Sequence, residues 1–110
     1  MISIGCTVQE GYVPEEIRPE LAAELARIST SILGGSPADV EVKFIEIPRG
    51  YGFQGGELSS RSGVGVLIPD GCDQQTRHRL LREINDRWCE ITGCSADELG
   101  VSAHDRSYQG

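Results

Sequence analysis

The sequence lacks the features by which nucleic-acid-binding, membrane-spanning and secreted proteins are recognised. Ten Lys and Arg residues are outnumbered by seventeen Asp and Glu residues among 110, which gives a formal net charge of −7. Such a chain has too few cations to neutralise the phosphates of a nucleic acid or the headgroups of an anionic membrane. Its apolar runs are far shorter than the ~20 residues that span a bilayer, and its start lacks the basic segment of a signal peptide. We therefore expect one cytoplasmic domain with no nucleic-acid or membrane partner.

Metal-ligand and disulfide patterns are absent as well. The four cysteines contain no pair at two-residue spacing, and only two histidines accompany them. A structural zinc site usually needs closely paired ligands, so we expect no metal and no other cofactor. A disulfide framework is not expected either, because the chain shows no secretory signal. Buried or unreactive thiols are the default interpretation for Cys6, Cys72, Cys89 and Cys94.

An internal repeat is the most informative feature that is present. Each half of the chain begins with an alternating apolar run, over residues 2–8 and 63–68, and a turn with an acidic residue and a glycine follows. The two acidic–glycine pairs, Glu10-Gly11 and Asp70-Gly71, are 60 positions apart. Alternation of this kind predicts a β-strand that ends in a turn.

A stretch with apolar residues at spacings of three and four follows each strand and predicts a helix. Pro14 suits the first turn of the first helix, and Gly34 and Gly93 suit the ends of the two helices. The residues expected to face the core are Ile17, Leu21, Leu25, Ile28 and Ile32 in the first helix and Leu81, Ile84, Trp88 and Ile91 in the second.

A second strand follows each helix, over residues 40–47 and 99–104. Strand, helix and strand in about forty residues form a βαβ unit with a right-handed crossover and parallel strands. Two tandem units predict an α/β fold, in which a four-stranded mixed sheet carries both helices on one face. The opposite face of such a sheet is uncovered, and a single bare layer predicts oligomerisation.

The linker between the units, residues 48–61, is rich in glycine, with four glycines among residues 50–56. It divides the expected single domain, residues 1–110, into a first unit at 1–47 and a second at 62–110. The run formally satisfies G-x-G-x-x-G, but that dinucleotide motif must lead directly into a helix, whereas this run leads to another strand. We interpret the linker as a hairpin that carries aromatic residues.

These residues resemble the tautomerase superfamily, whose type member is 4-oxalocrotonate tautomerase. The short members of that family are single βαβ units with an N-terminal proline, an acidic–glycine pair after the first strand and a late hairpin that ends in Gly-Gly-Glu-Leu. Here Glu10-Gly11 and Gly55-Gly56-Glu57-Leu58 match those motifs, and nearly the whole chain fits two fused units. The resemblance implies a homotrimer of fused chains whose bare sheet faces pack inward.

The resemblance also implies a chemistry in which the amine of the N-terminal proline is a general base or acid and arginines hold the substrate's carboxylates. Every one of these positions is substituted in this sequence. The proline position falls on Ile2, preceded by Met1, which we expect to be retained before so bulky a residue. The arginine positions fall on Tyr12 and Glu41, and the position of the hairpin phenylalanine falls on Gly52. In the second unit the aligned positions are Ser62, Cys72 and Gly100.

A rebuilt site would need other acid–base residues. Glu41 is a candidate general base, and Tyr12 and Tyr51 are candidate hydrogen-bond donors to a developing enolate. Each residue also has a simpler interpretation, because Glu41 suits a solvated strand position and the tyrosines suit an apolar cavity or an interface. Both interpretations stay open from the sequence.

Further residues are candidates for contact with a substrate. Arg49 and Arg61 flank the hairpin and could hold one carboxylate or carbonyl, although arginines at loop edges are commonly solvated. A different mechanism would pair Cys72 as a thiolate with His104, because their neighbouring parallel strands end at the same edge of the sheet. The candidate substrate-binding residues are Ile2, Arg49, Phe53, Arg61 and Cys72.

Two function classes follow. The first is a small-molecule enzyme of tautomerase, isomerase or lyase type that acts on a small carbonyl or enol compound without a catalytic proline. The second is a non-catalytic trimer that binds a ligand or a protein partner. Residues 1–60 hold four basic and nine acidic residues, so a dicarboxylate substrate is disfavoured. We favour the enzyme, because Glu41, Tyr12 and Tyr51 are chemically capable replacements.

Overall fold

The structure, a computed structural model, describes residues 2–107. Met1, with the prediction that it is retained, and residues 108–110 of the predicted domain lie outside the described residues. The elements follow the order β1 (Ser3–Gln9), η1 (Glu15–Ile17), α1 (Arg18–Leu33), η2 (Pro37–Asp39), β2 (Glu41–Ile47), β3 (Phe53–Gln54), β4 (Glu57–Leu58), β5 (Ser62–Ile68), α2 (Gln74–Thr92), η3 (Ala96–Glu98) and β6 (Leu99–Asp105).

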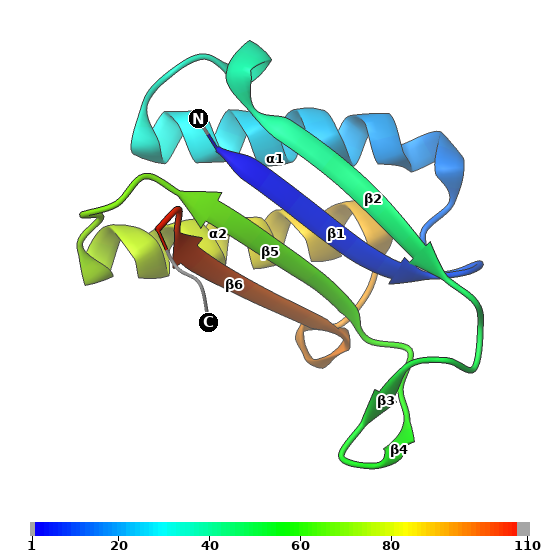
Figure 1. The fold of residues 1–110 in the computed structure, drawn as a ribbon. Helices are drawn as coiled ribbons and strands as arrows, with labels where there is room; N and C mark the ends of the chain where they lie inside the picture. The colour runs from blue at the N-terminus through cyan, green and yellow to red at the C-terminus, as the bar shows by residue number, and fades with distance from the viewer. Residues whose placement is uncertain (1, 108–110) are drawn as a thin grey trace.

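The main sheet has the strand order β2-β1-β5-β6 (Figure 1). Within each half the strands are parallel, β1 with β2 and β5 with β6, whereas β1 and β5 are antiparallel. Gly5 faces Gly65 at the middle of the antiparallel pairing. Two tandem βαβ units therefore form one mixed four-stranded sheet, which confirms the fold class predicted from the repeat.

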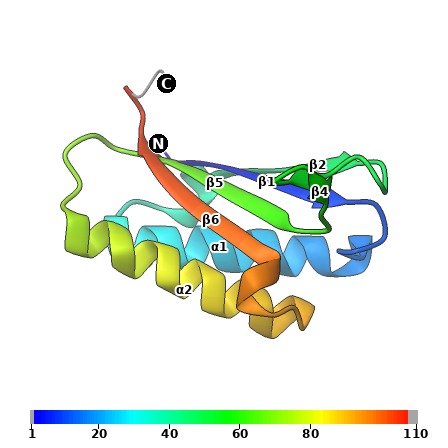
Figure 2. The same cartoon turned by 90° about the horizontal axis from the view of Figure 1, so that it is seen from below.

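Both helices cover the same face of this sheet, as Figure 2 shows. Alternate strand residues point into the layer between sheet and helices, because successive side chains of a strand lie on opposite faces. Burial raises the pKa of the Cys6 thiol to about 12, so this thiol is unreactive, as predicted. The strand residues fully buried in the core are Ile4, Cys6 and Val8 of β1 and Val64, Val66 and Ile68 of β5.

The core face of α2 differs from the prediction. Leu80, Ile84 and Trp88 are the buried residues of this helix, whereas Leu81 and Ile91 are only partly buried. The buried residues are spaced by four, whereas the predicted series that begins at Leu81 alternates spacings of three and four; both follow one side of the helix, so the packing decides which leucine is buried. The register carried over from the first helix is therefore wrong by one position at the start of α2.

The first helix also begins later than predicted. Pro14 precedes the short η1 turn, and α1 proper starts at Arg18 with Pro19 in its first turn, where the missing N–H of proline has no helical partner to lose. From there the predicted core residues Leu21, Leu25 and Ile28 are buried. Both helices end at the predicted glycines, Gly34 and Gly93.

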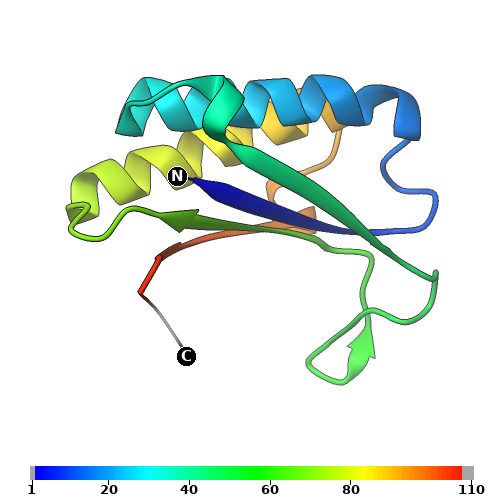
Figure 3. The ribbon, with the colours of Figure 1, turned by 45° about the horizontal axis from the view of Figure 1, so that its top comes forward.

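The face of the sheet opposite the helices is open. Ile45 on β2 and Leu67 on β5 are 56% and 37% exposed there. Nothing lies within 4 Å of a side chain added at Gly5 or Gly63. The β3–β4 hairpin lies on this side of the molecule, away from the helices (Figure 3). Within residues 2–107, none of the helices combines the length and the apolar character needed to span a membrane.

An ion-pair network joins the two helices on the outer side of the molecule. The carboxylate of Glu24 on α1 accepts hydrogen bonds from Arg27, one turn further on, at 3.0 Å and from Arg87 on α2 at 2.7 Å. These two hydrogen bonds lower the pKa of Glu24 from 4.5 to about 2. The network therefore stabilises the folded state while Glu24 is ionised.

Replacing each of the two neighbouring leucines by alanine in turn tests which side of α2 faces the core. Leu80→Ala should lower the free energy of unfolding by ~2–5 kcal/mol, because it opens a cavity in the core. Leu81→Ala should cost about 1 kcal/mol, because its side chain is only partly withdrawn from water. Urea unfolding followed by circular dichroism measures both variants, and a larger loss for Leu81→Ala would contradict the structure.

The contribution of Glu24 should depend on pH with a defined sign. Because the pKa of Glu24 is lower in the folded chain, its stabilisation is present above pH 4.5 and is lost as the pH falls toward about 2. Glu24→Gln should therefore lower the free energy of unfolding by about 1 kcal/mol or less near neutral pH, and the difference from wild type should shrink on acidification.

Glu83→Gln is the matched control, because Glu83 is hydrogen-bonded to Arg79 inside α2 and reaches Arg27 of α1 only through a weaker Coulombic interaction. Denaturant unfolding across the acid range measures both variants. A Glu24→Gln effect that is independent of pH would argue against an ionic origin.

Candidate functional site

The hairpin end of the sheet gathers several of the predicted site residues. A positive φ at Gly11 turns the chain after β1, and Tyr12 donates its backbone N–H to the carbonyl of Gln9 at 3.1 Å. The guanidinium of Arg49 lies over the Tyr12 ring, 5.6 Å from its centroid, in a cation–π contact. Arg49 and Tyr12, two predicted residues, therefore share one site. They line a hollow of about 290 Å³ with Gln9, Gly50, Leu58, Ser59 and Ser60.

A hydrogen bond from the Gln9 side chain links the end of β1 to the base of the hairpin. Its buried amide donates a hydrogen bond to the carbonyl of Ser59, and the N–H of Ser59 donates to the carbonyl of Gly52 at 2.7 Å. A side chain at Gly52 would collide with Gln9 and with Ser59, so this position requires glycine. Beyond this base the predicted aromatics are exposed, Tyr51 by 74% and Phe53 by 65%.

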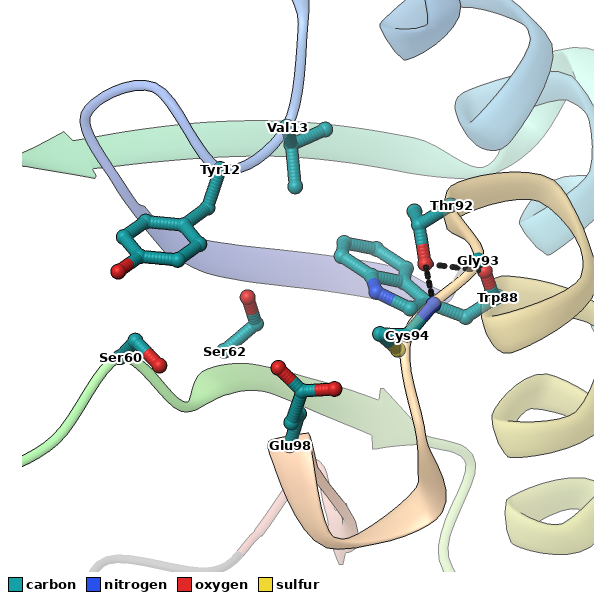
Figure 4. A pocket seen from close by; sticks show the side chains of 9 residues that line it. All are labelled: Tyr12, Val13, Ser60, Ser62, Trp88, Thr92, Gly93, Cys94 and Glu98. Carbon is teal, nitrogen blue, oxygen red and sulfur yellow. Dashed lines mark hydrogen bonds between the residues drawn. The ribbon is translucent and has the colours of Figure 1, made fainter.

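A second cavity opens on the helix side of the same end (Figure 4). Its volume is about 210 Å³, enough for a ligand of only a few atoms. Ser62, at the first position of β5, is buried at its base, and Tyr12 closes it from the β1 turn. The remaining lining comes chiefly from the end of α2 and from η3, namely Val13, Ser60, Trp88, Thr92, Gly93, Cys94 and Glu98.

Glu98 fixes the electrostatic character of this cavity. Its carboxylate accepts hydrogen bonds from the backbone N–H and the hydroxyl of Ser95, each at 2.9 Å, in a capping box. These bonds, the backbone one first, lower the pKa of Glu98, so the group stays anionic near neutral pH. Glu98 is therefore a poor proton acceptor there, and its charge favours ligands with hydrogen-bond donors over anions.

The opposite end of the sheet holds Ile2 and Glu41. Ile2 is only 5% exposed, and the backbone N–H of Glu41 donates to its carbonyl at 3.0 Å. The carboxylate of Glu41 points to the open side and pairs with Lys43 at 3.3 Å. Glu41 and Lys43 line a hollow of about 330 Å³ on the open face, which extends across the sheet to Leu67 and His104.

A single chain does not bring the three predicted catalytic residues together. Glu41 lies at the start of β2, beside Ser3, whereas Tyr12 and Tyr51 follow the far ends of β1 and β2. Seven residues at ~3.3 Å each separate the two ends by roughly 20 Å. Figure 1 shows the same arrangement, with the N-terminus at one end of β1 and the hairpin beyond the other.

Of the other predicted substrate contacts, Arg61 and Phe53 share one hollow, whereas Cys72 lies apart from them. Arg61 donates to the carbonyl of Leu99 at 3.2 Å and borders an open-face hollow of about 350 Å³ together with Phe53. Cys72, in the turn after β5, directs its thiol to the carbonyl of Asp73 at 3.6 Å. His104 stands opposite Leu67 in the strand register. Among residues 2–107, no cluster of three His, Cys, Asp or Glu side chains has the geometry to hold a metal ion.

Sequence reasoning missed most of the cavity of Figure 4. The family resemblance aligns Ser62 with the proline position of the second unit, Trp88 is predicted only as a core residue of a helix, and Cys94 only as a buried or unreactive thiol. No prediction concerns Glu98. One signal was available for Glu98, because Ser95 and Glu98 have the spacing of a capping box. The cavity itself depends on how α2 packs on β5, which no local pattern reveals.

Comparison with known proteins finds solved structures with the same architecture. The sequence matches no family model and no curated protein. Native Ps01740, a crystal structure, matches with a TM-score of 0.89 at 30% identity, over 94% of this chain and 92% of that one. N1, a member of the cis-3-chloroacrylic acid dehalogenase family, matches at 0.87 and 19% identity, over 94% and 73%. The symmetric trimer of Q0 fused 4-OT matches at 0.83 and 17% identity, over 94% and 84%.

The match at 30% identity extends over nearly the full length of both chains, and the dehalogenase-family and fused 4-OT structures share the two-unit fold with its antiparallel junction and one-sided helices. The chain belongs to the tautomerase superfamily.

Proposed function

We propose that this protein is a tautomerase-like enzyme that uses acid–base residues other than proline on a small carbonyl or enol substrate. The observation that carries the proposal is the position of Glu41. Its backbone is hydrogen-bonded to Ile2, the residue that the sequence resemblance aligns with the catalytic proline. The backbone of Glu41 thus lies beside the position at which this family holds its catalytic amine, and its carboxylate, directed to the open face, can perform the same proton transfer.

The proposed site is completed between copies of the chain in a homotrimer. Within one protomer Glu41 lies far from the tyrosines, but Tyr51 and Phe53 extend from the hairpin with most of their surface exposed. Large exposed aromatic groups beside an open sheet face are typical of an interface. A trimer of the kind found for Q0 fused 4-OT would let the hairpin end of one copy approach the Glu41 end of the next.

The chemistry follows from the two kinds of group that would meet there. Glu41 accepts the proton from the carbon beside the substrate's carbonyl, and the partner subunit's Tyr51 donates a hydrogen bond to the enolate oxygen that develops. Return of the proton to a different atom completes the tautomerisation. Packing of the sheet faces would remove water from Glu41 and Lys43, which strengthens these interactions.

The substrate class follows from the charge of the site. Glu41 and the acidic first unit disfavour a dicarboxylate, whereas Arg49 beside Tyr12 supplies one cation at the hairpin end. We therefore propose a neutral compound or a monocarboxylate with a conjugated or enolisable carbonyl. The relationship to the cis-3-chloroacrylic acid dehalogenase family, whose name specifies a small unsaturated monocarboxylic acid, supports this choice.

One observation favours the second function class, a non-catalytic trimer that binds a ligand. Ile2 is buried and fills the proline position with an unreactive alkyl group. The hollow beside it, between the end of α1 and Pro69, measures only about 140 Å³. On this alternative the hollows would bind small molecules without turning them over.

Glu41→Gln should lower the rate of tautomerisation by ~10²-fold or more, because the amide keeps the shape of the side chain but cannot accept the proton. Enol–keto conversion of phenylpyruvate and of other small monocarboxylates, followed by ultraviolet absorbance, measures the rate. Glu16→Gln, at an exposed carboxylate on the far side of the β1 turn, is the control and should match wild type. Ligand binding by the wild type without turnover would favour the non-catalytic alternative.

Light scattering tests the assembly independently of activity. The wild-type chain should scatter as three copies of 11.9 kDa. Leu67→Glu should give a monomer with unchanged helical circular dichroism, because three copies would bring three new carboxylates together on the inner faces. His78→Glu adds the same charge to an exposed position of α2, outside the proposed interface, and should stay trimeric. A monomeric wild type would overturn the site between copies.

A further inference from the structure

Two cysteines outside the proposed site are in direct contact. The sulfurs of Cys89, in the last turn of α2, and Cys94, just beyond the helix, lie 3.2 Å apart in a hydrogen bond that either thiol can donate. Both side chains are partly buried, and both are free thiols. A disulfide bond joins two sulfurs at about 2.05 Å, so the pair needs only a small further approach to be linked.

The end of α2 explains how residues five apart come together. Gly93 adopts a left-handed conformation with φ of 79° and donates its N–H to the carbonyl of Cys89 at 2.8 Å. This cap reverses the chain, so Cys94 folds back over the last helical turn. The hydroxyl of Thr92 accepts the N–H of Cys94 at 3.3 Å and donates to the carbonyl of Trp88 at 2.8 Å. The backbone of the helix end thus brings the two cysteines together, and their side chains complete the contact.

We propose that Cys89 and Cys94 form a reversible redox site, in which a peroxide converts the two thiols to a disulfide within one chain. The site lies apart from Glu41 and Tyr51, whereas Tyr12 lines the same cavity as Cys94, and the proposal does not depend on the enzyme function. Its chemical class is that of a dithiol that responds to two-electron oxidants.

The oxidant is the one reactant that the chain does not supply, and the atoms balance in two steps. The sulfur of Cys94 attacks one oxygen of hydrogen peroxide, the O–O bond breaks, and the second oxygen leaves as water, which gives a sulfenic acid. The sulfur of Cys89 then attacks the sulfenic sulfur, the S–O bond breaks, and a second water leaves as the S–S bond forms. Two thiols and one peroxide thus become one disulfide and two waters.

The surroundings of the two sulfurs decide which of them reacts first. Cys94 lines the cavity of Figure 4 and is reached from it. Burial, reinforced by the hydrogen bond between Cys89 and Cys94, raises the pKa of the Cys89 thiol to about 12, so Cys89 is a poor first nucleophile. Cys94 is therefore the sulfur that meets the oxidant, and Cys89 resolves the sulfenic acid from the helix side.

The disulfide would change the cavity as well as the thiols. Thr92, Gly93 and Cys94 form one wall of the cavity, and the cross-link would tie this wall to the helix. Trp88, the one tryptophan of the chain, lines the same cavity and immediately precedes Cys89. Its fluorescence therefore reports on the pair, because a disulfide quenches a neighbouring indole.

Titration of the full chain with hydrogen peroxide tests the proposal. The wild type should lose two of its four free thiols, its mass should fall by two hydrogen atoms, and peptide mapping should place the link between Cys89 and Cys94. Tryptophan emission should fall in step and recover on addition of dithiothreitol. Oxidation of Cys94 to the sulfinic acid without a link would overturn the proposal.

Cysteine variants separate the pair from the other thiols. Cys94→Ser and Cys89→Ser should each abolish the loss of two hydrogens and the change in emission. Two variants are used so that the test still stands if one of them fails to fold. Cys72→Ser is the matched control, because Cys72 is also partly exposed but lies at the other end of α2, and it should behave as wild type. A disulfide between chains through Cys72, with the pair still reduced, would also overturn the proposal.

Discussion

The antiparallel pairing of β1 with β5 is the constraint on which the rest of the structure depends. Because the two units run in opposite directions across this junction, the end of each first strand lies beside the start of the other. Tyr12 and Val13, which follow β1, therefore close a cavity over Ser62, the first residue of β5. At the other end Pro69, which follows β5, reaches the hollow around Ile2 in the same way. Each unit thus completes the terminal hollow of the other.

The two hollows have become different because their central residues differ. Ile2 fills its position with an alkyl side chain and leaves about 140 Å³, whereas the small and polar Ser62 leaves about 210 Å³. The larger of the two hollows therefore lies at the first residue of the second unit. The carboxylate of Glu41, whose backbone is hydrogen-bonded to Ile2, lies on the opposite side of the sheet, above the open face, whereas Asp39 lines the hollow itself. A reaction that uses Glu41 must consequently take place on the open face, which is the reason that the proposed catalysis needs a second copy of the chain.

The fold followed from the sequence because its signals are local and occur twice. Strand alternation and the acidic–glycine turns mark the ends of elements whatever surrounds them, and the repeat excluded most other topologies. The register of α2 did not follow, since Leu80 and Leu81 are adjacent apolar residues and only the packing against β5 and β6 decides which is buried. The contact between Cys89 and Cys94 depends on the left-handed turn at Gly93, which converts a spacing of five into proximity. The cavities depend on tertiary packing and had no sequence signal.

The redox pair and the proposed catalytic residues lie at different places for a physical reason. Catalysis by Glu41 requires the sheet face, where a neighbouring copy can exclude water, whereas oxidation of Cys94 requires access from solvent on the helix side. The strands separate these two environments, because one face of the sheet is committed to the helices and the other is left open. Tyr12 connects them: Arg49 holds its ring at the hairpin end, and Tyr12 also closes the cavity that Cys94 lines. A change in the cavity wall would therefore reach the proposed active site through Tyr12, and through the hairpin that Arg49 begins.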